Sequence, residues 1–105
     1  MAITGKLLYR ALSLHHNAPH SCATDMESLF YSLMDVASGG RALPWQAIPS
    51  EKAVYSSKYT TIHDDEEWGK ALGVCNAHLQ SLIDRLRGVV HQGGTADQYL
   101  AVFYA

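Results

Sequence analysis

Apolar residues recur three or four positions apart over much of this chain, which is the spacing of one face of an α-helix. The longest stripe in the first half consists of Met26, Leu29, Phe30, Leu33, Val36 and Ala37. Thr24 and Glu27 precede it at the spacing of a capping box, in which each side chain binds the backbone N–H of the other residue. Gly39 and Gly40 follow, and glycine readily adopts the left-handed conformation that ends helices. The pattern therefore predicts a buried helix over residues 24–38.

The second half of the chain shows the same spacing, in stretches that each begin with a capping residue. The predicted caps are Ser50, Asp64, Asn76 and Thr95. The apolar residues that follow them are Ala53, Val54 and Tyr55, then Trp68, Ala71 and Leu72, then Leu79, Leu82, Ile83, Leu86 and Val90, and finally Tyr99, Leu100 and Phe103. The first of these helices is expected to run through Tyr59, and Gly93-Gly94 ends the third. The prediction is an all-α fold of about four to five helices around the buried helix 24–38.

Composition and charge exclude several classes of protein. The 105 residues are 48% hydrophobic and 17% charged, which is too apolar for a disordered segment and too lightly charged for a coiled coil. The net charge is −2 and the basic residues are scattered, so we expect no nucleic-acid partner. No apolar run approaches the roughly 18 residues of a membrane span, and residues 1–6 lack the core of a secretion signal. We therefore expect an intracellular, cytoplasmic protein with no membrane partner.

The residue types that bind zinc gather in one place, at His15, His16, His20 and Cys22. A structural zinc site needs four ligands, usually in two pairs, and a second pair is missing unless Cys75 or His78 folds alongside. A solvated loop without metal is therefore expected. Cys75 with His78 is a weak nucleophile candidate, because a small buried thiol is the usual role of such a cysteine. The two cysteines are expected to be reduced, with one bridge as the alternative.

The remaining candidates also have structural explanations. His63 and His91 each lie near the end of a predicted element, where a cation or polar cap accounts for them. The glycine pairs lack the strand–glycine–helix context and the lysine of a phosphate loop, so they are interpreted as helix stops. Composition and spacing alone therefore give no active site, no metal ligand and no cofactor-binding residue.

Two motifs at a fixed separation connect the chain to a known family. The segment Gly5-Lys6-Leu7-Leu8-Tyr9-Arg10-Ala11-Leu12-Ser13 resembles the Gly-Thr-x-x-Tyr-x-Ala-Pro-Glu that ends the activation loop of protein kinases. Asp25 stands twelve residues beyond it, where kinases have the aspartate that opens the central helix of the large lobe. Residues 25–29 and 43–46 look most like casein kinase 1, and fungal-type kinase-like proteins carry a similar helix. The resemblance covers residues 5–46.

This resemblance implies a partial kinase large lobe over residues 1–105. Residues 1–23 would be the end of the activation segment and a loop, 24–38 the central helix, and 50–105 the following helices. The landmark residues it implies are Gly5, Tyr9, Arg10, Ala11, Asp25 and Trp45. Of these, Asp25 would hold the catalytic-loop backbone, Tyr9 and Arg10 would line the path of a substrate peptide, and Trp45 would pin the loop after the central helix.

The departures from the family pattern argue against activity. Lys6 replaces a threonine, Leu12-Ser13 replaces Pro-Glu, and Phe30 replaces a glycine. The missing glutamate leaves Arg85 or Arg87 without the partner that a late large-lobe arginine has in the family. Phosphoryl transfer also needs a Gly-rich loop, a strand lysine and two catalytic aspartates, all upstream of the matched segment.

The expected function is thus that of a non-catalytic fragment of a Ser/Thr kinase-like domain, which is no enzyme alone. ATP and Mg²⁺ are expected only in a full-length relative. The alternative is a small helical interaction module without enzymatic activity. In either case the missing neighbours would leave one face of the central helix uncovered, so a protein partner or self-association is expected there.

Overall fold

The computed structural model describes residues 9, 11–12, 21–45 and 50–104, and these form five α-helices without a strand. The helices are α2 (Cys22–Ala37), α3 (Glu51–His63), α4 (Asp65–Gly73), α5 (Gln80–Gln92) and α6 (Ala96–Tyr104). The predicted all-α fold is therefore confirmed. Helix α3 extends to His63, beyond its predicted end at Tyr59.

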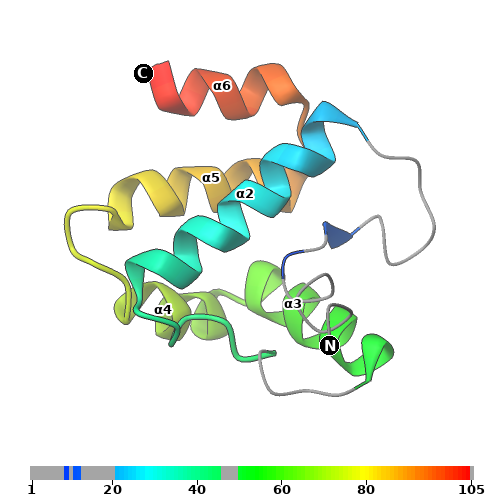
Figure 1. The fold of residues 1–105 in the computed structure, drawn as a ribbon, viewed down its shortest axis with the longest axis vertical. Helices are drawn as coiled ribbons and strands as arrows, with labels where there is room; N and C mark the ends of the chain where they lie inside the picture. Colours follow the sequence, from blue (N-terminus) through cyan, green and yellow to red (C-terminus); the bar gives the residue numbers. More distant parts are fainter. Residues whose placement is uncertain (1–8, 10, 13–20, 46–49, 105) are drawn as a thin grey trace.

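Helix α2 crosses the middle of the molecule in front of α5, with α6 along one side and α3 and α4 along the other (Figure 1). Helix α5 packs against α2, α3, α4 and α6, and α2 also packs against α6. The core between them holds the aromatic rings of Phe30, Tyr31, Trp45, Trp68 and Tyr99. The centre of the fold is therefore shared by α2 and α5.

Helix α2 begins earlier than its sequence pattern predicts, because Ser21 and not Thr24 is its N-cap. The Ser21 hydroxyl accepts from the Thr24 amide at 3.2 Å, and the Thr24 hydroxyl accepts from the Ser21 amide at 2.9 Å. This is a capping box shifted by three residues, so the prediction that Glu27 reaches back to Thr24 was wrong. The carboxylate of Glu27 instead accepts hydrogen bonds from the Leu12 amide and the Tyr31 hydroxyl. The predicted end was right, since Gly39 and Gly40 have φ of +63° and +84°.

The buried face of α2 is also turned relative to the predicted apolar stripe. Phe30, Tyr31 and Met34 are buried, whereas Leu29 is 50% exposed and Val36 is 79% exposed. Two residues assigned to the core by their spacing therefore lie on the surface. The side of α2 that faces the core is the one that carries the large rings and the polar groups that bind inside the protein.

The caps of the later helices follow the sequence in three of four cases. The Ser50 and Asp64 side chains accept from backbone amides at the starts of α3 and α4, and Thr95 and Gln98 bind each other's amides at the start of α6. Asn76 was predicted to cap α5, but that helix begins at Gln80. The Asn76 side chain instead accepts from the His78 amide at 2.9 Å, so it caps the turn that precedes α5.

Candidate functional site

Tyr9 and Trp45, two of the residues that carry the family resemblance, both contact α2. The Tyr9 hydroxyl donates to the Asp35 carboxylate at 2.6 Å, and Ala11 is completely buried. Trp45 is buried with its ring edge-on to Tyr31, the centroids 5.6 Å apart. Trp45 therefore belongs to the core. The other two landmarks of the segment, Gly5 and Arg10, lie outside the described residues.

The carboxylate of Glu27 joins this segment to α2. It accepts from the Leu12 amide at 2.7 Å and from the Tyr31 hydroxyl at 2.7 Å. Burial raises the pKa of Glu27, while these two hydrogen bonds and the charge of Lys58 act in the opposite direction. Burial, followed by the nearby Glu27 carboxylate, likewise raises the pKa of Tyr31 and of Tyr99. The group is thus a buried hydrogen-bonded network, and it fixes the position of the chain at Leu12.

A buried lysine completes the network from the α3 side. Lys58 is fully buried, and its ammonium lies 5.3 Å from the ring centroid of Tyr31 and 5.8 Å from that of Trp45. Cations are attracted to the faces of such rings, most strongly when both are removed from water. The sequence pattern did not predict this residue, because it assigned only apolar side chains to the inner face of α3. Its spacing of four from the buried Val54 was the available signal.

Asp25 occupies a different environment from the one that the resemblance implies. Its side chain is exposed in the first turn of α2, where the helix dipole favours a carboxylate. The part of the chain that the structure describes contains no hydrogen-bond donor to this carboxylate. Asp25 is thus an exposed residue at a helix start, and Glu27 is the acidic residue that holds a neighbouring backbone.

The late arginines also differ from expectation. Arg87 donates to the Ile62 carbonyl at 2.8 Å and to the Asp65 carboxylate at 3.0 Å, and its guanidinium lies 5.5 Å from the Trp68 ring centroid. The indole of Trp68 donates to Asp84 at 2.8 Å. Arg87 therefore has an acidic partner, although not the one that the family motif would supply, and it ties α5 to the junction of α3 and α4.

The candidate nucleophile pair is not assembled. Cys75 is buried and donates to the Ala71 carbonyl at 3.5 Å, and burial raises the pKa of its thiol. His78 is exposed in the turn before α5, so the two do not share a helix face. Cys22 is an exposed free thiol, and the three histidines suggested beside it lie outside the described residues. Among the residues that are described, no group of three or more His, Cys, Asp or Glu side chains could hold a metal ion.

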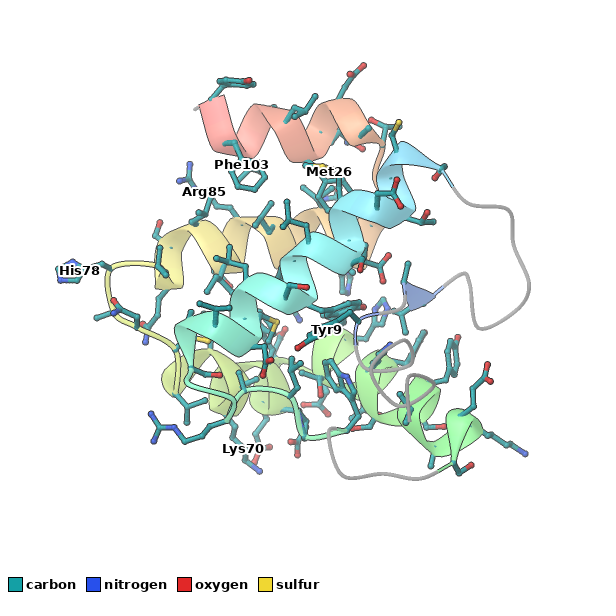
Figure 2. All side chains as sticks on the ribbon, in the orientation of Figure 1. Tyr9, Met26, Lys70, His78, Arg85 and Phe103 are labelled. Carbon is teal, nitrogen blue, oxygen red and sulfur yellow. The ribbon has the colours of Figure 1, made fainter. Side chains whose placement is uncertain are left out.

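The opposite side of α2 presents apolar side chains to solvent. Beside Leu29 and Val36, the exposed residues of this kind on the neighbouring α6 include Leu100 and Phe103, each 42% exposed. Figure 2 shows Phe103 directed from α6 towards α5, in the region where Met26 of α2 and Arg85 also lie. We call Leu29 and Val36, which lie seven positions apart on one side of α2, the exposed apolar face. Its chemistry suits contact with another apolar surface.

Comparisons with known proteins give no identification. No family model, no curated protein and no solved structure matches this chain. No helix in the described part of the chain is both long and apolar enough to cross a membrane.

Proposed function

We propose that this chain is a C-terminal large-lobe segment of a Ser/Thr protein kinase-like domain, and that it serves as a non-catalytic platform. The sequence register of residues 5–46 supports the lineage. The contacts of Tyr9 and Trp45 with α2 and the burial of Ala11 are compatible with that lineage. The platform is intracellular in this proposal, and ATP with Mg²⁺ binds only to a full-length relative.

The observation that carries the proposal is the hydrogen bond from the Leu12 amide to Glu27. Leu12 and Ser13 stand where the family motif has Pro-Glu, so the motif's own glutamate cannot anchor this segment. A carboxylate from α2 provides an anchor at this point. In this proposal Leu12 belongs to the activation-segment end that would face a substrate. Glu27 holds it on the central helix in place of the family's usual ion pair, which fits a divergent member.

The proposal predicts that the chain has no nucleotide site of its own. The melting temperature of the purified chain should stay unchanged when Mg-ATP is added, with Mg-GTP and Mg²⁺ alone as controls. A saturable rise with Mg-ATP only would overturn the non-catalytic platform. The genomic sequence directly upstream of Met1 tests the lineage, because in-frame Gly-rich, strand-lysine and His-Arg-Asp motifs should be found there. Their absence would contradict the fragment and favour the second candidate.

That second candidate is a free-standing helical interaction module, and the exposed apolar face favours it. Val36 is 79% exposed and Leu29 is 50% exposed, both on α2, and Phe103 of α6 is 42% exposed. Apolar side chains grouped in this way often mark sites of protein association. In the first candidate the rest of the kinase-like domain covers this face, and in the second a separate polypeptide or another copy covers it.

A further inference from the structure

Two histidines from different helices are in contact where α3 meets α5. His63 is the last residue of α3 and His91 lies in the last turn of α5, and their ring centroids are 4.5 Å apart with planes inclined at 46°. Tyr59, one turn earlier on α3, stacks on His63 with a centroid separation of 4.1 Å. The end of α3 is thus attached to α5 partly through an imidazole pair.

The charged groups nearest to this pair are Arg87, Asp64 and Asp65, and His91 itself is exposed to solvent. On α5, Arg87 donates to the carbonyl of Ile62, the residue next to His63, and to Asp65 of α4. Asp64 accepts from the amides of Glu66 and Glu67. Of these two carboxylates, Asp65 is paired with Arg87, and Asp64 caps the start of α4. The C-terminal dipole of α3 favours a cation at His63, but burial, His91 and Arg87 together lower the pKa of His63 below its ordinary value of 6.5.

We propose that the His63–His91 pair is a proton-sensitive joint, which holds the end of α3 on α5 when both rings are neutral and releases it when they are protonated. Two neutral imidazoles can stack, whereas two imidazolium rings at this separation repel each other. Release would also weaken the bond from Arg87 to the Ile62 carbonyl. Histidine is the side chain whose ordinary titration lies in the physiological range, so the joint responds to mild acidification.

The joint reaches the candidate site through α3. Lys58 lies five residues before His63 on the same helix and contacts the rings of Tyr31 and Trp45. Loosening the end of α3 would therefore disturb the packing that supports the Glu27 network. Acidification would in this way act on the platform through a contact that lies outside the Glu27 network.

The sign of the effect follows from the direction of the shift. A histidine with a lowered pKa in the folded state binds its proton more tightly in the open state. The attachment of α3 is then complete above pH 6.5 and is lost as the pH falls through the lower folded value. Each pKa unit between the two states makes opening up to about tenfold more favourable at low pH.

Hydrogen exchange by NMR on the full chain, in EDTA, tests the joint. Between pH 7.5 and 5.5 the opening constant for the amides of Thr61–Asp64 should rise severalfold, after correction for intrinsic exchange. In His91→Gln the rise should be smaller, and the His63 titration should move towards 6.5. His78→Gln removes an exposed histidine from the turn before α5 and should behave as the parent. An opening constant independent of pH, or equal behaviour of the two variants, would overturn the proposal. His63→Gln gives a second, independent check, since it should abolish the rise.

Discussion

The two long faces of α2 are composed differently from those of an ordinary surface helix. The face towards α3 and the 9–12 segment carries Glu27, Tyr31 and Asp35, whose polar atoms form hydrogen bonds inside the protein. The other face carries Leu29 and Val36, which are exposed. In most surface helices apolar side chains face the core and polar ones face water.

This difference shows that burial here follows the available partners and not polarity alone. Burying a carboxylate is costly unless donors compensate it, and Glu27 has an amide, a hydroxyl and the charge of Lys58 nearby. Among the described residues there is no hydrogen-bond partner for one buried oxygen of Asp35, so that face is not fully satisfied. The exposed face, by contrast, carries apolar side chains that lie against solvent.

Substitutions at the adjacent residues Phe30 and Leu29 should show the largest difference in unfolding free energy between the buried and the exposed side of α2. Phe30→Ala should lower the free energy of unfolding by about 3–5 kcal/mol, because it removes a buried ring packed on Tyr31 and Trp68. Leu29→Ala should cost less than about 1 kcal/mol, since its side chain is half exposed. Urea unfolding measures both, with Phe30→Leu as a milder variant if Phe30→Ala does not fold. Equal costs at the two positions would remove the distinction between the faces.

The buried network should show the next largest effect. Glu27→Ala should cost about 2–4 kcal/mol, because it leaves the Leu12 amide and the Tyr31 hydroxyl without their acceptor and removes the charge that faces Lys58. Glu66→Ala is the matched control on an exposed helix start and should change stability by less than about 0.5 kcal/mol. Thermal unfolding measures both variants. If Glu27→Ala costs no more than the control, the network does not hold the 9–12 segment.

The N-cap of α2 is the next feature to test, because both faces belong to the helix that it starts. Ser21→Ala should cost about 1 kcal/mol through loss of the N-cap. Ser28→Ala, within the same helix, should cost less than about 0.5 kcal/mol. Chemical-shift mapping should show fraying at residues 22–25 in the first variant only. A helix that still begins at Cys22 in Ser21→Ala would argue that Thr24 suffices as the cap.

The smallest effect on stability is expected on the exposed face. Val36→Lys should leave the free energy of unfolding within about 0.5 kcal/mol of the parent, since the side chain already faces water. It should nevertheless abolish any concentration-dependent association of the chain in sedimentation velocity. Ala53→Lys, at an exposed position on α3, should leave association unchanged. Association that persists in Val36→Lys would show that the contact lies elsewhere.

The helices were predictable from sequence to the extent that local signals decided them. Gly39, Gly93 and the caps Ser50 and Asp64 act through nearby backbone, so their roles were found from the sequence. The start of α2 was not, because Ser21–Thr24 and Thr24–Glu27 both fit a capping box and only the tertiary use of Glu27 decides between them.

The candidate site was less predictable, since its residues meet through long-range packing. A period of 3.6 finds an apolar stripe but cannot tell which apolar residues remain uncovered, so Leu29 and Val36 were assigned to the core. It also ignores polar residues, so the burial of Lys58 was missed. Asp25 and Glu27 are two positions apart, and only the fold shows that the second reaches the 9–12 segment.

The two cysteines differ in their exposure to solvent, so thiol labelling can report on the opening of the fold. Cys22 is exposed at the start of α2, whereas Cys75 is buried between Met34 and Ala71. A thiol reagent should modify Cys22 at once and Cys75 only when the contact between α2 and the end of α4 opens. With Cys22→Ser, the rate of Cys75 labelling would thus time the separation of these two elements without an added probe.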